Sequence, residues 1–469
     1  MFFLLSCFQF QIETIADSGD AGDSGGFTTD STSAETGDTD TPPTQLSAVS
    51  ARLNELVPSV FYVGWTQSEQ ASAKVEYSVD EGIWLSTPDI SREAGTHEQI
   101  VLGVPFAAPV QYRVTLAAGD SSVSSTEATI TTGPLPDGVP VARAVSGDEA
   151  LWDVGATFVY IGMSGEGEEF DGDWWTMVVD RAGRVVWALP TPYGFVSLHP
   201  RVAPDGKAFL VDYNSYWGQF DGGTRSQVAR TRIDGVVEQV WDTPGLHHAF
   251  TQLPDGAMAW GAMSRGDERL EVLGPDGVLS TLWNCGAFLE GLGEQAICGS
   301  NTLYYDEQTD HFLFSFYSVD AVIEVDRVTG ETVRWFGDVP GSWTFDPPET
   351  QFWWQHGPSL TAKGNLLIST HMTEKGGEAT VVREYQFDDG SETLREVWSF
   401  GTVEDDWVYG DQMGEAWRLD GGNTLHNYGT NPLLRESTPD GTVAWKMSWE
   451  RGYTLGRSTP IADIYALAP

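Results

Sequence analysis

From about residue 150 onward, the order of hydrophobic and polar positions repeats six times. Each copy has an apolar stretch, a small-residue turn, alternating β-branched and aromatic residues, a tight turn ending in glycine, and a segment closed by tryptophan. Alternation with a period of two is typical of a half-buried β-strand. The copies read DRAGRVVWAL from Asp180, RIDGVVEQVW from Arg232, GPDGVLSTLW from Gly274, RVTGETVRWFG from Arg327, FDDGSETLREVWSFG from Phe387 and TPDGTVAWKMSW from Thr438. The pattern predicts six groups of short antiparallel strands.

The turn glycines give the length of this repeat: Gly183, Gly235, Gly277, Gly330, Gly390 and Gly441. Their spacing of roughly 40 to 60 residues is typical of four-stranded propeller blades, so residues 145–469 are predicted to form a six-bladed β-propeller. An open ring would leave two unpaired sheet edges. The C-terminal GRSTPIADIYAL has no blade of its own, and we expect it to pair with the first blade near TMVVDRAG. A truncation after Gly452 would then collapse the domain.

A second all-β segment, residues 46–137, precedes the repeats. SVFYVGWTQ, KVEYSVD, QYRVTLAAGD and TEATITTGP show alternating β-branched and aromatic positions separated by turns. With Tyr112 in QYRVTL and the closing TITTGPLP, the segment resembles a fibronectin type III β-sandwich, in which Trp65 would be a core residue. It offers no convergent polar cluster, which favours a spacer or docking platform. The boundary before the propeller is marked by Pro134, Pro136 and Pro140.

Residues 1–45 are predicted to be an anchor followed by a tether. Cys7 follows the letters LLS, which resemble the lipobox of a bacterial lipoprotein, where a small residue precedes a lipidated cysteine. The acidic tract DSGDAGDSGGFTTDSTSAETGDTDTPPT has the composition of a flexible, solvated chain. Because FFLL lacks a positively charged segment before it, we expect the true start to lie upstream; the alternative is an accidental match. The expectation is an exported protein, in the periplasm or at the cell surface and held there by a lipid.

The net charge of −43 excludes one class of partner. Nucleic acid phosphates would be repelled by so acidic a surface, which mainly keeps a protein soluble and hydrated. No apolar run approaches the ~20 residues of a membrane span, so a lipid on Cys7 would be the contact with a membrane.

The other two cysteines, Cys285 and Cys298, are predicted to form a disulfide. In an exported protein such a bond is worth roughly 3 kcal/mol on the chain-entropy model. Their spacing is not the short CxxC spacing of a structural zinc site, and the sequence predicts neither a metal nor a cofactor.

Several of the eight histidines fall at one recurrent place, just before or at the first strand of a blade: His199, His247, His248 and His356. In a propeller this strand lines the axial channel, so three blades would aim imidazoles at one centre. The alternative for each histidine is a structural role in a turn or at a strand end.

The segments around these histidines resemble a known family. HHAFTQLPDG from His247, SNTLYYDEQTDHFLFSFYSVDAVIEVDRVTGETVRWFG from Ser300, FWWQHGPSL from Phe352 and RLDGGNTLHNYGTNPLLRESTPDGTVAW from Arg418 are similar to segments of the bacterial arylsulfate sulfotransferases. These are exported enzymes with a six-bladed propeller and an added β-sandwich, and the resemblance covers about residues 46–469. Members move a sulfuryl group from an aryl sulfate to a phenol without a nucleotide donor.

The resemblance implies roles for particular residues. His356 would be the nucleophile, because a neutral imidazole attacks at neutral pH and its N–S adduct is labile enough to pass the group on. Asn301 would bind a sulfuryl oxygen, with His247 or His248 opposite as donor or general acid. Aromatic side chains would stack on the phenyl ring: Trp217, Trp260, Trp353, Trp354 and Tyr317.

Two positions depart from the family pattern and motivate other hypotheses. Gly299 stands where the family has a histidine, and Tyr317 stands where it has a sulfuryl-binding arginine. Arg418, Arg383, Arg265 or His426 would have to reach the channel to compensate. The second hypothesis is therefore a propeller that has lost catalysis and binds an aromatic or carbohydrate ligand. The third is a propeller enzyme of another chemistry, such as a lyase or hydrolase, since the fold hosts many.

Overall fold

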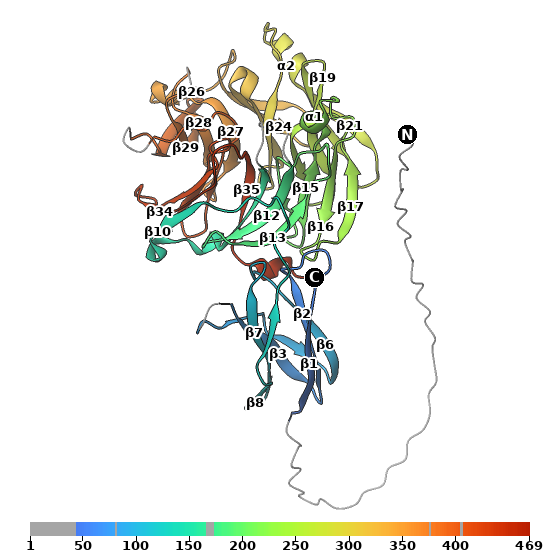
Figure 1. The fold of residues 1–469 in the computed structure, drawn as a ribbon. Coiled ribbons are helices and arrows are strands. Elements are labelled where there is room, and N and C mark those ends of the chain that lie inside the picture. Colours follow the sequence, from blue (N-terminus) through green and yellow to red (C-terminus); the bar gives the residue numbers. More distant parts are fainter. Residues whose placement is uncertain (1–43, 80–81, 166–172, 375–376, 404–406) are drawn as a thin grey trace, which may run out of the picture. The chain divides into compact units, whose positions relative to one another are not determined.

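A computed structural model of the protein describes residues 44–469, apart from 80–81, 166–172, 375–376 and 404–406 (Figure 1). Thr44–Pro469 is one compact unit. Its described residues are nearly all in β-strands and turns, with two short α-helices, α1 (Ser215–Gln219) and α2 (Cys285–Gly291). No helix in this part of the chain is long and apolar enough to cross a membrane. Cys7 and the predicted tether up to residue 43 lie outside the described residues.

Six sheets of four or five strands follow one another along the described part of the repeat region, and their strands are antiparallel except for one parallel pair in the fifth sheet. Sheet 1 contains β13 (Val185–Pro190), β12 (Trp174–Asp180), β11 (Phe158–Ser164) and β35 (Leu455–Ile461). Sheet 2 contains β14 (Arg201–Val202), β15 (Phe209–Tyr213), β16 (Gln227–Thr231) and β17 (Val237–Asp242). Sheet 3 contains β18 (Leu246–Gln252), β19 (Met258–Ser264), β20 (Asp267–Leu273) and β21 (Leu279–Asn284).

The remaining three sheets repeat this order. Sheet 4 contains β22 (Ser300–Asp306), β23 (His311–Phe316), β24 (Ala321–Asp326) and β25 (Thr332–Gly337). Sheet 5 contains β27 (Trp353–Leu360), β28 (Leu366–His371), β29 (Thr380–Asp388), β30 (Thr393–Phe400) and β26 (Thr344–Asp346), which pairs in parallel with β30. Sheet 6 contains β31 (Glu415–Arg418), β32 (Thr424–Asn427), β33 (Leu433–Ser437), β34 (Val443–Ser448) and β10 (Ala144–Gly147).

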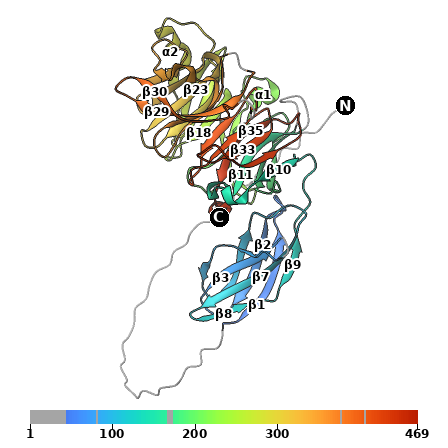
Figure 2. The ribbon, with the colours of Figure 1, turned by 90° about the vertical axis from the view of Figure 1, so that its left-hand side faces the viewer.

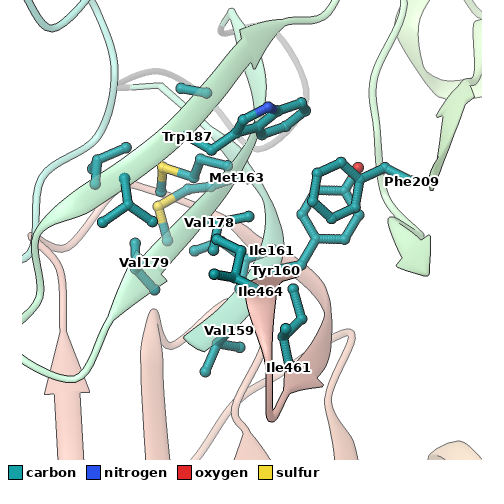
Figure 3. Packing of buried hydrophobic residues seen from close by; sticks show 14 of the residues in the cluster. Val159, Tyr160, Ile161, Met163, Val178, Val179, Trp187, Phe209, Ile461 and Ile464 are labelled. Carbon is teal, nitrogen blue, oxygen red and sulfur yellow. The ribbon is translucent and has the colours of Figure 1, made fainter. Parts of the chain in front are cut away.

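Each sheet packs on the next through buried apolar side chains, and sheet 6 packs on sheet 1. Between sheets 1 and 2, the Tyr160 ring stacks on Phe209 with centroids 4.2 Å apart, and Trp187 lies 4.6 Å from Phe209 (Figure 3). The sheets therefore form a closed, propeller-like arrangement in which β35, β14, β18, β22, β27 and β31 are the inner strands.

Tryptophans of the repeats also link neighbouring sheets through hydrogen bonds from their indole N–H groups. The indole N–H groups of Trp187, Trp283, Trp398 and Trp445 donate to Ile233 O, Thr332 Oγ1, Pro439 O and Arg181 O, each on the following sheet. A buried indole needs such an acceptor. These four tryptophans therefore stabilise the packing between neighbouring sheets.

Two strands, one from each end of the repeat region, complete the arrangement of six sheets. The predicted return of the C-terminal segment takes it into sheet 1, but its partner there is β11, with Phe158 opposite Ile461 and Met163 opposite Leu455, rather than the TMVVD strand β12 (Figure 2). The strand β10, which the sequence pattern did not single out, pairs with β34 at the outer edge of sheet 6. The first strand of the repeat region thus completes sheet 6, and the last strand completes sheet 1.

Two further antiparallel sheets enclose a separate apolar core over residues 46–131. One contains β1 (Leu46–Leu53), β2 (Phe61–Gln67) and β6 (Gly95–Val101); the other contains β4 (Leu85–Ser86), β3 (Ala71–Ser78), β7 (Pro109–Ala118) and β8 (Ser121–Ser124), with β5 (Ile90–Arg92) on β3 and β9 (Ala128–Thr131) on β7. Alternate residues of β2 are buried, and Trp65 is fully buried with its N–H bonded to Gln67 Oε1. Ser59 Oγ donates to Val186 O, and Tyr465 Oη accepts from Leu102 N, so this region also contacts sheet 1 and the C-terminal residues.

Cys285 and Cys298 form the predicted disulfide, which ties the start of α2 to the residues before β22. Such bonds persist in oxidising environments, which suggests that the protein is exported.

Candidate functional site

One cavity of about 340 Å³ lies where the inner strands β18, β22 and β27 begin. Its lining residues are Trp217, Phe220, His248, Asn301, Tyr317, Trp354, His356, Asp411, Gln412 and Met413. His248, Asn301 and His356 occupy corresponding places on three successive sheets, as expected if the first strands converge. The predicted aromatic residues Trp217, Trp354 and Tyr317 line the same cavity.

His356 is held by an irregular stretch of backbone. β27 has register shifts on both sides of this residue, and a β-bulge re-aims a side chain next to a site. Trp354 has a φ of 50°, in the left-handed region, and its N–H donates to Asp320 Oδ1 at 2.5 Å. Gly357 has a φ of 60°, and a Cβ there would lie 2.9 Å from Glu415 Cα, so this position requires glycine.

The hydrogen bonds of His356 fix which ring nitrogen carries the proton. Nδ1 lies 2.8 Å from Trp354 O, and because a carbonyl only accepts, Nδ1 bears the hydrogen. Nε2 then holds the lone pair, and it has no hydrogen-bond partner among the described residues. Burial, and next the positive charge of Arg457, hold the pKa of His356 well below its ordinary value, so the ring is neutral at pH 7.

Arg457, on the closing strand β35, is the functional candidate that the sequence reasoning missed. Its side chain is fully buried; Nη2 donates to Asn301 O at 2.8 Å and to Thr302 Oγ1 at 2.7 Å. Nη1 is buried without a hydrogen-bond partner among the described residues. Burial lowers the pKa of Arg457 to about 10, which still leaves the guanidinium charged at pH 7.

His199 supports Arg457 instead of lining the cavity. Arg457 Nε lies 3.1 Å from His199 Nε2, and the same Nε2 lies 3.2 Å from Asn301 O. Burial, and then the charge of Arg457, hold the pKa of His199 well below its ordinary value. The histidine therefore fixes the guanidinium in place without adding charge.

Asn301 joins the cavity to this cation. Its Nδ2 donates one hydrogen to Gln355 O at 2.6 Å, which leaves the second hydrogen of the amide for another acceptor. Its backbone oxygen accepts from Arg457. A single hydrogen bond thus links the cavity residue Asn301 to the buried guanidinium of Arg457.

His248 lines the cavity and His247 lies behind it. Their Nδ1 atoms are 3.3 Å apart, and His247 Nδ1 is 3.3 Å from Oε2 of the fully buried Glu268. Glu268 also accepts from the backbone N–H of Ser300 at 2.5 Å and from the Ser300 hydroxyl. Burial, and next the neighbouring His247, hold the pKa of His248 well below its ordinary value, so this ring too is neutral at pH 7.

Gly299 and Tyr317 are adapted to each other. A Cβ on residue 299 would lie 3.0 Å from Tyr317 Oη and 3.1 Å from two ring carbons. The tyrosine ring therefore fills the space in which a side chain at 299 would begin, so the residue at 299 and the position of the Tyr317 ring depend on each other.

Two residues predicted to bind substrate, Arg418 and His426, do not line this cavity. Arg418 lies at the far end of β31 from the cavity residues 411–413, and its Nη2 bonds Glu384 Oε2 at 2.5 Å. His426 lies on β32, the second strand of its sheet, where Nε2 is 2.9 Å from Ser369 Oγ in the packing between sheets 5 and 6.

The other residues proposed to compensate or to stack are also absent from the cavity wall. Arg383 pairs with Glu396, and Arg265 is a turn residue with a φ of 56°. Trp260 is buried in the apolar cluster between sheets 2 and 3. Trp353 precedes the cavity residue Trp354 but does not line the cavity.

Comparison with known proteins gives no family for this chain. No family model matches it, and no curated protein is similar to it. A protein of unknown function from Bacteroides caccae has a TM-score of 0.44 and 14% identity, over 66% of this chain and 100% of its own. A putative 6-phosphogluconolactonase from Bacteroides uniformis has a TM-score of 0.41 and 12% identity, over 83% and 99%. A catalytically inactive virginiamycin B lyase from Staphylococcus aureus, solved with quinupristin, has a TM-score of 0.38 and 12% identity, over 60% and 83%.

Proposed function

We propose that the protein is a sulfotransferase that moves a sulfuryl group from an aryl sulfate to a phenol through a sulfo-histidine at His356. In this proposal the six sheets are the blades of a six-bladed β-propeller, and residues 46–137 are a fibronectin type III-like sandwich. The disulfide supports export, and we place the protein in the periplasm or at the cell surface, anchored by a lipid on Cys7.

One observation carries the proposal: a neutral imidazole with its free lone pair at a cavity, and a buried guanidinium that is hydrogen-bonded to the cavity residue Asn301. Because Nδ1–H of His356 is bonded to Trp354 O, Nε2 is the nitrogen available to attack sulfur. The charged, unpartnered Nη1 of Arg457 and the second amide hydrogen of Asn301 supply donors for sulfuryl oxygens. In this proposal Arg457 supplies the positive charge of the sulfuryl-binding arginine, whose place in the family pattern is occupied here by Tyr317.

In this proposal the sulfuryl transfer takes place in two steps. First, Nε2 of His356 bonds to sulfur as the S–O bond to the aryl group breaks, and the bonding pair leaves with the phenolate oxygen. Second, the acceptor oxygen bonds to sulfur as the N–S bond breaks and its pair returns to Nε2. The phenolate released in the first step takes its proton from water. In the second step the neutral His248 takes the acceptor's proton and then releases it to water.

The aromatic part of either substrate lies against Trp217, Tyr317 and Trp354. The direct experiment is to incubate the protein with p-nitrophenyl sulfate and a phenol and to measure nitrophenol release and the sulfated acceptor. Absence of both products over several donors and acceptors would reject the proposal.

Replacing Arg457 with leucine is expected to lower kcat/KM for p-nitrophenyl sulfate by about 100-fold or more, since preplaced donors for developing charge typically contribute that much. Arg457→Lys keeps the charge and should retain part of the activity. Because the guanidinium depresses the pKa of His356, Arg457→Leu should also move the acid limb of the pH profile upward. A variant that melts normally and keeps both the rate and the pH profile would contradict this role.

The departures from the family pattern at Gly299 and Tyr317 favour a second candidate function, a propeller that binds an aromatic or carbohydrate ligand without reaction. In that case the native protein releases no nitrophenol, and only the double variant Gly299→His, Tyr317→Arg gains turnover. Our proposal predicts the opposite: the native protein is active, and Gly299→His alone lowers kcat/KM because the new Cβ displaces the Tyr317 ring. Nitrophenol release by the native, single and double variants separates the two functions.

A further inference from the structure

The burial of the lining residues gives the cavity a floor and a mouth. His248, Asn301 and His356 are buried and form the floor, where the reacting oxygen would lie. Phe220 and Trp354 are 67% and 45% exposed, and Asp411 is also exposed, so these three side chains form the mouth. A substrate bound with its reacting end at the floor therefore presents its opposite end to the mouth.

Among the described residues, those that form the mouth carry one negative charge and no positive charge. Asp411 is the one side chain charged at pH 7 among the described residues that line the cavity, because His248 and His356 are held neutral. Tyr409 Oη donates to Asp411 Oδ1 at 2.7 Å, which orients the carboxylate. The whole chain adds a net charge of −43, so the long-range field has the same sign.

Aromatic faces accompany this carboxylate. Trp354 and Phe220 stand at the mouth, and Trp217 lines the same cavity. Aromatic faces attract cations through their quadrupole, and a carboxylate adds direct charge attraction.

We propose that the mouth is a subsite for a cationic group, so that the preferred aromatic substrates carry an ammonium opposite the reacting oxygen. This inference rests on the proposed function for the position of the reacting oxygen at His356. The subsite itself is defined by Asp411, Phe220 and Trp354.

A pair of phenols of equal shape tests the subsite. (4-Hydroxyphenyl)trimethylammonium and 4-tert-butylphenol differ in charge and hardly in size, so their affinity ratio reports the charge preference alone. By calorimetry at low salt, the cationic phenol is expected to bind about 10-fold more tightly to the native protein. Asp411→Asn, which keeps a hydrogen-bond acceptor for Tyr409, should bring the ratio close to one.

Asp120→Asn is the matched control, since it removes the same charge from an exposed turn between β7 and β8. It should leave the ratio unchanged; an equal loss in this variant would assign the preference to net charge and overturn the subsite. Equal binding of both phenols by the native protein would overturn it too, even with sulfuryl transfer observed. A charge preference that depends on Asp411 without any turnover would support the subsite and reject the sulfotransferase function.

Discussion

Removal of residues 453–469 is expected to leave the protein unable to fold. This segment contains β35, which pairs along its length with β11, and it contributes Leu455, Ile461, Ile464 and Leu467 to the buried cluster of sheets 1, 2 and 6. Emptying one buried leucine or isoleucine position costs about 2–5 kcal/mol. Four such positions and a lost strand exceed the roughly 5–15 kcal/mol by which a folded domain is stable. Circular dichroism and a thermal melt of the truncated protein should show no cooperative transition.

A shorter deletion provides the control for this experiment. Ala468 and Pro469 follow the last buried residue of the segment, so their removal should change the melting temperature little. A cooperative melt of the long truncation near that of the full chain would show that β35 does not hold the sheets together.

Replacement of His356 with alanine is expected to reduce nitrophenol release by about 10⁴-fold or more, since loss of a nucleophile removes the covalent route and leaves only binding and charge stabilisation. The fold should survive, because the side chain borders the cavity and does not lie within an apolar cluster. Rates of nitrophenol release and thermal melts of the variant and native proteins check both statements. His97→Ala, a change in strand β6 of the sandwich region, is the control and should be fully active.

The pH dependence of kcat/KM tests the role of His356 independently. The reactive form of His356 is neutral, and burial with Arg457 places its pKa well below the ordinary value of 6.5. The acid limb of kcat/KM should therefore fall below pH 6.5, with activity lost only as pH decreases through the depressed pKa. An acid limb at or above pH 6.5 would contradict the electrostatics described for this site.

The sequence predicted the sheets well because their signals are local. Alternation and turn glycines repeat within each copy, and the histidines keep a fixed place relative to them. That regularity predicted His199, His247 or His248, and His356 at one centre, and the family resemblance added Asn301; His248, Asn301 and His356 line the cavity, whereas His199 does not.

The position of Arg457 beside Asn301 was not predicted from the sequence. It belongs to no repeat, since β35 is supplied from the far end of the chain to complete sheet 1. Its place beside Asn301 depends on a pairing register that no local pattern contains. The sequence did hold one signal: the C-terminal segment was expected to join the first sheet, so its one arginine, Arg457, was a candidate for a buried position there.

Arg418 and His426 do not line the cavity, for the complementary reason. Both lie in a segment that resembles the family, yet Arg418 is at the far end of its inner strand and His426 is on a second strand. Proximity in sequence to a signature segment does not specify which end or which strand of a sheet a residue occupies.

The central claim is that sulfur becomes bonded to His356. The most direct measurement mixes the native protein with p-nitrophenyl sulfate without an acceptor, quenches at alkaline pH, and maps the digest by mass spectrometry. We expect a burst of one nitrophenol per active site and a sulfuryl group on the peptide that carries His356, which is lost when a phenol is added before the quench. Nitrophenol release with no adduct on that peptide, or with the adduct on another residue, would contradict it.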